Sequence, residues 1–198
     1  MLMEPTIIFN ALKEWAVAIN TLESGKTIML LRKGGIHEQG GRFQVENQQV
    51  LLYPTYEHQQ GFMLKAEYAD SVNPVTSGWH PETIRIGSWA KITDVLPVSD
   101  ESTVRELLPF HIWNEHFISD RLKWKSRQPL FVLLLRTYKL PQVKDIPYLP
   151  EYGGCKSWIN LDQPICLEDS QPALSDAKYN QLVADIRNIV GDKLCTVR

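Results

Sequence analysis

The longest strongly apolar run of the chain, Leu130 to Leu135, begins a segment that extends to Tyr138 and is bounded by Pro129 and Pro141. Proline has no backbone N–H to donate, so it is found at the ends or edges of β-strands. A continuous apolar run between two such prolines is typical of a strand that is buried on both faces. The segment therefore predicts the central strand of a sheet, and it is too short to span a bilayer as a helix.

Charge and cysteine content narrow the class of protein. The 198 residues carry a formal net charge of −2, which excludes a strongly basic nucleic-acid coat protein and leaves a local basic patch open. Cys155, Cys166 and Cys195 form no Cys-x-x-Cys pair, which argues against a zinc ribbon and a disulfide framework. Residues 1–9 lack the basic leader of a secretory signal. We therefore expect one soluble cytoplasmic domain over residues 1–198.

Helical periodicity predicts a helix near each end of the chain. Near the start, apolar side chains recur at spacings of three and four, at Leu12, Trp15, Ile19 and Leu22. This pattern indicates an amphipathic helix over residues 10–24. A second such pattern predicts a helix over residues 175–190, with Gly191 just past its end. Further helices are expected from residue 55 to about residue 68 and from residue 101 onward.

Short β-rich runs predict the remaining strands, which are expected to pair mainly antiparallel. Prolines and glycines over residues 141–154 predict a long loop. The expected strands, besides the central one, cover residues 27–33, 43–45, 50–53, 82–86 and 90–98.

The first candidate site is a basic turn that begins at Arg32 and Lys33, directly after a predicted strand. The next residues, Gly34 and Gly35, permit close approach of backbone amides to an anion. In a Walker A loop the lysine follows the glycines, whereas here the cations precede them, so the turn is not a P-loop. It is either an anion-binding element or a glycine-rich hairpin with solvated charges.

The second candidate site, residues 53–59, gathers polar groups behind one predicted strand. Glu57 and His58 have the donor atoms and titration ranges for acid–base chemistry or for binding a metal. Neighbouring residues on a helix point about 100° apart, so a metal would need further ligands from elsewhere. The alternative is the polar N-terminus of a helix.

The third candidate site, residues 152–158, combines flexible backbone with Lys156, Ser157 and Trp158. Trp158 would stack on a base while Lys156 contacts a phosphate, as in single-stranded nucleic-acid sites. The alternative is that Trp158 anchors this loop to the core. A nucleophilic role for Cys155 would require a lowered pKa.

A basic segment follows the middle of the chain, at Arg121, Lys123, Lys125 and Arg127. In an extended conformation these cations would lie on one face, where they would follow a phosphate backbone. The alternative is a charged edge strand that prevents aggregation.

Four motifs occur in order along the chain, at Ala11–Trp15, Leu30–Ile36, Leu52–Gln59 and Gly154–Trp158. Together they resemble the bacterial domain-of-unknown-function 1802 family, which is common in cyanobacteria. The resemblance covers about residues 10–162 of this chain. Because that family has no established activity, the resemblance implies a family and no mechanism.

The order of the short strands is also similar, at the level of fold, to the PUA-like group, whose EVE and ASCH domains bind RNA or modified bases. Residues 51–54 take the place of the strand before the EVE ligand pocket, and residues 90–98 and 131–138 take the places of later barrel strands. We therefore expect an α+β domain with a curved, mainly antiparallel sheet flanked by helices. The sheet is expected to be either open or partly closed into a PUA-like barrel.

The repeated combination of glycine, cation and aromatic side chain predicts a nucleic-acid or nucleotide binding module. RNA, DNA or a nucleotide is the expected partner, no membrane is expected, and no metal site, cofactor or catalytic residue is assigned. The expected ligand-binding residues are Arg32, Lys33, Gly34, Gly35, Tyr53, Thr55, Glu57, His58, Lys156, Ser157 and Trp158.

Two other functions stay open at this point. One is a metal-dependent hydrolase or nuclease that uses Glu57 and His58. The other is a scaffold or regulatory domain, for which the three candidate sites would lie on separate surfaces.

Overall fold

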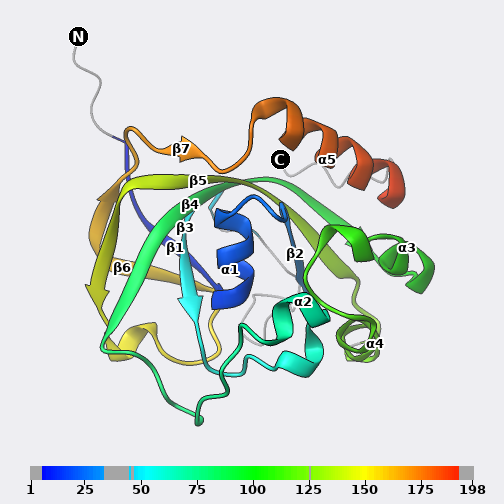
Figure 1. Ribbon diagram of the computed structural model, residues 1–198, viewed down its shortest axis with the longest axis horizontal. Helices are drawn as coiled ribbons and strands as arrows, with labels where there is room; N and C mark the ends of the chain where they lie inside the picture. The colour runs from blue at the N-terminus through cyan, green and yellow to red at the C-terminus, as the bar shows by residue number, and fades with distance from the viewer. Residues whose placement is uncertain (1–5, 34–44, 46, 125, 192–198) are drawn as a thin grey trace.

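The computed structural model describes residues 6–33, 45, 47–124 and 126–191, and within them it has a mixed α+β architecture (Figure 1). Seven strands form one sheet in the order β2-β5-β4-β3-β1-β6, and β7 pairs with β5 off this path. The strands are β1 (Ile7–Trp15), β2 (Met29–Arg32), β3 (Gln49–Thr55), β4 (Thr83–Val98), β5 (Leu130–Pro147), β6 (Trp158–Cys166) and β7 (Gln171–Pro172).

Five α-helices and three short 3₁₀ turns flank this sheet in the described part of the chain. The α-helices are α1 (Ala16–Glu23), α2 (Ala66–Ala69), α3 (Glu101–Glu106), α4 (Glu115–Lys123) and α5 (Asp176–Val190). The turns are η2 (Gly61–Met63), η3 (Leu108–Phe110) and η4 (Pro150–Tyr152). The predicted α+β fold is thus confirmed. None of the described helices is long and apolar enough to cross a membrane.

The sheet is mainly antiparallel, as predicted, and the one parallel pair among the described strands positions the site. β1 and β3 run parallel, with Trp15 opposite Thr55 at their carboxyl ends. The two ends of the strand path, β2 and β6, are not paired with each other among the described residues. The described strands therefore form the open sheet rather than a closed barrel.

The prediction of a central strand at residues 130–138 is confirmed, because β5 pairs with β2, β4 and β7. The predicted loop over residues 141–154 is wrong in its first part, since β5 continues to Pro147. A register shift in the β4–β5 ladder lies between the pairs Ser88↔Lys139 and Ile86↔Lys144. Pro141 falls within that irregularity, where a missing N–H donor is tolerated.

The predicted helix over residues 10–24 is wrong in its first part. Residues 10–15 belong to β1, and the helix begins only at Ala16. The apolar residues at spacings of three and four belong to two different elements. Leu12 and Trp15 lie in strand β1, whereas Ile19 and Leu22 lie in helix α1. Pairing with β3 and β6 on either side overrides the local periodicity.

The predicted helix over residues 55–68 is also wrong. η2 and the four-residue α2 occupy part of this segment, and His58 has a φ of 65°, which is incompatible with a right-handed helix. The expected strands over residues 82–86 and 90–98 are one continuous strand, β4, bent by two register shifts. Most of the strand expected at residues 43–45 lies outside the described residues. The predicted C-terminal helix is confirmed as α5, and Ser175 Oγ accepts a hydrogen bond from the Lys178 N–H at its start.

Side chains of β1 and β3 alternate between two apolar cores. Leu12 and Leu52 belong to the first core, which also contains the buried faces of α1, α4 and α5. Leu51 and Tyr53 belong to the second core, which contains Tyr152 and residues of β6. Because successive side chains on a strand point to opposite faces, the next residues along these strands reach opposite sides of the sheet.

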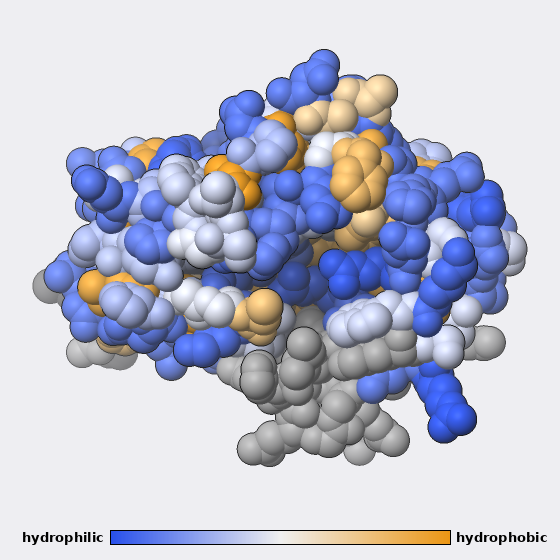
Figure 2. Space-filling view, turned by 90° about the horizontal axis from the view of Figure 1, so that it is seen from below, coloured by the Kyte–Doolittle hydropathy of each residue, from blue (hydrophilic) through white to orange (hydrophobic). Residues whose placement is uncertain are grey.

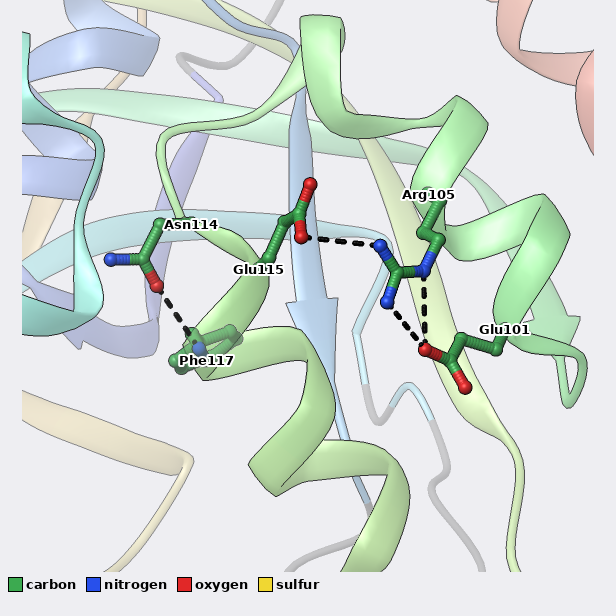
Figure 3. Close-up of polar contacts among 5 residues, drawn as sticks. All are labelled: Glu101, Arg105, Asn114, Glu115 and Phe117. Carbon is green, nitrogen blue, oxygen red and sulfur yellow. Dashed lines mark hydrogen bonds and ion pairs between the residues drawn. The ribbon is translucent and has the colours of Figure 1, made fainter.

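Helix α4 is fixed to its neighbours at its first turn (Figure 3). Asn114 Oδ1 accepts a hydrogen bond from the Phe117 N–H at 3.1 Å and so caps the helix. Arg105 of α3 forms ion pairs with Glu101 at 2.8 Å and with Glu115 of α4 at 3.1 Å. These pairs are exposed and contribute little stability, but the buried Phe117 fixes which face of α4 points inward.

Candidate functional site

A cleft of about 570 Å³ lies at the carboxyl ends of the parallel strands β1 and β3. Its volume falls in the range of small-molecule sites, roughly 300 to 1,000 Å³. Figure 2 shows the face toward which these strand ends point, where hydrophilic and apolar side chains surround a hollow. Functional groups gather there because both strands end at this edge of the sheet.

The cleft extends around the edge of the sheet, so it has two sides. Lys13 and Tyr53 are register partners on the side of the second core, and we call this the tyrosine side because Tyr56, Tyr148 and Tyr152 also line it. Glu14, the next residue of β1, points to the other face and meets Arg32. We call that the arginine side; it is also lined by Lys33, Trp113, Phe117, Arg121 and Trp124.

On the tyrosine side, Lys13 holds the loop that follows η4. Its Nζ donates hydrogen bonds to the Tyr152 carbonyl and, at 2.9 Å, to the Gly154 carbonyl. The Lys13 N–H also donates to the Ser157 carbonyl at 2.9 Å. Burial, followed by the nearby Lys156 cation, lowers the pKa of Lys13 from its usual range. The ammonium is satisfied by neutral carbonyls, so its positive charge is not cancelled by them.

Tyr53 lines the tyrosine side but is almost fully buried, with 2% of its surface exposed. Its ring lies edge-on to that of Tyr152, with 5.8 Å between centroids. Its hydroxyl has no hydrogen-bond partner in the described structure. Burial raises the pKa of Tyr53 well above its usual value, so the group is a neutral, unsatisfied hydroxyl.

Replacing Tyr53 with phenylalanine is expected to raise the free energy of unfolding by about 1 kcal/mol, because it removes a buried hydroxyl that has no partner. Tyr152→Phe is the matched control. The Tyr152 hydroxyl accepts a hydrogen bond from the Asp162 N–H at 2.8 Å, so its loss should lower stability by about 1 kcal/mol. Urea denaturation of both variants measures the difference. A destabilised Tyr53→Phe would show that the Tyr53 hydroxyl is satisfied.

Glu57 and His58 lie at the outer rim of the tyrosine side. One Glu57 carboxylate oxygen accepts hydrogen bonds from Ser77 Oγ at 3.1 Å and from the Gly78 N–H at 2.7 Å. The Gly78 bond, aided by Ser77, lowers the pKa of Glu57, which is therefore ionised at neutral pH. His58 Nε2 lies 3.4 Å from the same carboxylate. Glu57 thus fixes the loop over residues 77–81.

Among the residues that the structure describes, no group of three or more His, Cys, Asp or Glu side chains is placed to hold a metal ion. Glu57 and His58 therefore have no further ligand of these types beside them in that part of the chain. The arrangement gives no specific support to the nuclease alternative.

The loop over residues 77–81 contributes planar side chains to the cleft. Trp79 is 45% exposed and lies edge-on to Tyr56, with 6.0 Å between ring centroids. His80 stacks on Tyr148 with an interplanar angle of 13°. These rings offer flat, partly accessible surfaces, of the kind on which a nucleobase stacks.

On the arginine side, Glu14 and Arg32 form a largely buried ion pair at 2.9 Å. Their side chains are 7% and 17% exposed respectively. A second Arg32 nitrogen donates to the Lys13 carbonyl at 3.3 Å. Arg32 is therefore neutralised by Glu14 and forms part of the wall.

Lys33 and Arg121 meet at the end of α4. Lys33 Nζ donates hydrogen bonds to the Arg121 carbonyl at 2.7 Å and the Leu122 carbonyl at 3.2 Å, so it caps the carboxyl end of the helix. The Arg121 guanidinium lies over the Phe117 ring at 5.0 Å and the Trp124 ring at 5.8 Å. Burial is the main cause that lowers the pKa of Arg121, although an arginine remains charged at neutral pH.

Most of the predicted ligand-binding residues line this cleft. They are Arg32, Lys33, Tyr53, Thr55, Glu57, His58, Lys156 and Ser157. Trp158 is not among the residues that line it and instead packs against the first core from β6. Gly34 and Gly35 lie outside the described residues. The described parts of all three candidate sites share one cleft rather than lying on the separate surfaces expected of a scaffold.

Several residues of the cleft have no sequence pattern that assigns them to it. Lys13 and Glu14 were expected on a helix, where their burial could not be foreseen. Arg121 was considered in an extended segment, which is wrong because residues 115–123 form α4. Trp79 and His80 were read as loop residues; a tryptophan and a histidine beside Pro81 were the only available signal.

Charge in the cleft differs from that of the whole chain. Among the residues that the structure describes, five basic side chains and two carboxylates line it, whereas the formal net charge of the chain is −2. The basic residues are Lys13, Arg32, Lys33, Arg121 and Lys156. A concave surface of one charge sign concentrates ligands of the opposite sign. The cleft is therefore suited to an anion that also carries a planar group.

Residues 11–185 match the family described as domain of unknown function (DUF1802). The chain belongs to this family. The match covers the cleft and the resemblance noted in the sequence, and it extends further toward the C-terminus. No curated protein matches the chain.

Among solved structures, the chain is similar to an ASCH protein from Zymomonas mobilis, with 11% identity and a TM-score of 0.46 over 88% of this chain and 93% of that one. A variant of that protein has 10% identity and a TM-score of 0.44, over 88% and 96% of the two chains. Both belong to the PUA-like group named from the strand order. At these values the similarity to the DUF1802 chain is loose.

Proposed function

We propose that the cleft binds a nucleotide, either free or as an unpaired residue of RNA or DNA. The observation that carries the proposal is the excess of basic side chains over carboxylates among accessible aromatic rings, in a chain that is acidic overall. Aromatic rings stack on any base, and cations contact its phosphate. Few other common ligands combine a flat ring with a strong negative charge.

Tyr53 and Trp158, the residues first expected to stack on a base, are not placed to do so. Tyr53 is too buried to present its face to a base, and Trp158 does not line the cleft. Stacking is therefore assigned to Trp79, which is exposed at the rim. The unsatisfied Tyr53 hydroxyl would instead offer a hydrogen bond to a polar atom of the ligand after a small movement of the side chains around it.

Isothermal titration calorimetry at low salt, with nucleoside monophosphates and short RNA and DNA strands, tests the proposal. We expect binding of at least one probe and about a tenfold loss of affinity in Trp79→Leu, since stacking on an aromatic residue is worth about 1 to 3 kcal/mol. Phe62→Leu is the control, because Phe62 is 63% exposed and does not line the cleft. Absence of binding by every probe would refute the proposal, and equal losses in both variants would refute the location.

A further inference from the structure

Building on the proposed function, we infer that Arg121 binds the phosphate of the nucleotide, so that the ligand lies across the sheet edge with its phosphate on the arginine side and its base on the tyrosine side. The preferred ligand class is then a nucleoside monophosphate or a phosphorylated strand end, rather than a nucleoside. Arg121 becomes the residue that distinguishes them.

Arg121 is the basic side chain of the arginine side whose guanidinium lies over aromatic rings and has no carboxylate or carbonyl partner among the described residues. None of the described carboxylates forms an ion pair with it, although the charges of Glu14 and Asp120 act on it from a greater distance. Its guanidinium lies over the faces of Phe117 and Trp124. Its burial disfavours the charged form, which is why its pKa is lowered. A partly desolvated guanidinium without an anion is costly. A phosphate would accept two parallel hydrogen bonds from its planar donors.

The other cations of the arginine side are already engaged. Arg32 is paired with Glu14, and Lys33 caps α4 through two carbonyls. Lys33 still adds positive charge beside Arg121, whereas the Glu14–Arg32 pair adds no net charge. Of the basic side chains described on this side, Arg121 is therefore the one left to contact an incoming anion.

The tyrosine side suits the base better than the phosphate. Its Lys13 ammonium is used by the Tyr152 and Gly154 carbonyls, and Glu57 is ionised at its rim and would repel a phosphate. Trp79 and the His80–Tyr148 stack supply planar surfaces there. The competing phosphate contact is Lys156, which is exposed and donates to the Glu151 carbonyl at 3.2 Å.

Calorimetric titration with a nucleoside and its 5′-monophosphate measures how much the phosphate adds to affinity. In the wild-type protein we expect the monophosphate to bind at least about tenfold more tightly, the value of one charge-assisted hydrogen bond or more. Arg121→Gln should reduce this ratio to about threefold or less while leaving nucleoside affinity unchanged. Lys156→Gln should retain the wild-type ratio, and Arg121→Lys should restore part of it.

These titrations distinguish a wrong phosphate assignment from the absence of nucleotide binding. If nucleoside and monophosphate bind equally, or if Lys156→Gln rather than Arg121→Gln removes the ratio, the cleft binds nucleotides but the phosphate assignment is wrong. If neither binds, both proposals fail. A thermal unfolding curve for each variant shows that it is folded before titration. Comparing 5′-phosphorylated with 5′-hydroxyl oligonucleotides distinguishes a strand end from a free nucleotide as the source of the phosphate.

Discussion

Replacing Glu14 with glutamine is expected to lower the free energy of unfolding by about 3 kcal/mol. The substitution keeps the size of the side chain but leaves Arg32, which is only 17% exposed, without its anion. Breaking one partner of a buried ion pair is strongly destabilising, because the remaining charge stays out of water without compensation. Glu14 also accepts a hydrogen bond from the Trp15 N–H at the point where β1 ends and α1 begins. Urea denaturation at neutral pH measures the change.

The matched control for this prediction is Glu23→Gln. Glu23 pairs with Arg85 at 3.0 Å, and the Arg85 side chain is 48% exposed. An ion pair with one solvated partner contributes about 0 to 1 kcal/mol. The free energy of unfolding of this variant should therefore be lower than that of the wild type by less than about 1 kcal/mol. Equal effects of the two substitutions would contradict the view that the Glu14–Arg32 pair forms a buried wall of the cleft.

Acidification from pH 7 to pH 4.5 is expected to remove about 2 to 3 kcal/mol of stability through His111 alone. His111 is 2% exposed, and burial, followed by the nearby Lys65 cation, lowers its pKa to about 3 in the folded protein. The unfolded chain binds the proton near pH 6.5. The contribution of His111 to the free energy of unfolding is therefore complete above about pH 6.5 and is lost as the pH falls toward 3.

Denaturation of the wild type and His111→Gln at several pH values isolates this contribution from that of the carboxylates. The variant should show a shallower loss of stability between pH 6.5 and pH 4.5, whatever its stability at neutral pH. Parallel curves for the wild type and His111→Gln would show that His111 is not held neutral by burial.

The elements predicted correctly from the sequence are those with a clear local pattern of apolar residues. The apolar run at residues 130–138 and the periodic pattern at residues 175–190 became β5 and α5, because burial on both faces and a capped amphipathic face each leave a clear pattern. Residues 10–15 failed because their burial comes from β3 and β6, which pair with them from distant parts of the chain. No local pattern records that pairing.

The same reasoning explains which site residues were found. Thr55 and Glu57 were found because they lie in a dense polar cluster behind a predicted strand, and Lys156 because it lies in a loop that combines glycines, polar groups and an aromatic side chain. Glu14 and Arg121 were not assigned to the site, since the partner of Glu14 lies on β2 and the aromatic faces under Arg121 become visible only once residues 115–123 form α4. Whether a charged side chain has a partner of opposite charge depends on residues that are distant in sequence, so it can be determined only from the structure.

Chemical-shift mapping by NMR tests the central claim, that the cleft at the ends of β1 and β3 binds nucleotides, most directly. During titration of the wild-type protein with a nucleoside monophosphate, the largest amide shifts are expected at residues 13–15, 53–58, 78–81 and 119–123, which line both sides of the cleft or flank residues that do. Shifts confined to residues outside these segments, or none at millimolar nucleotide, would contradict the claim.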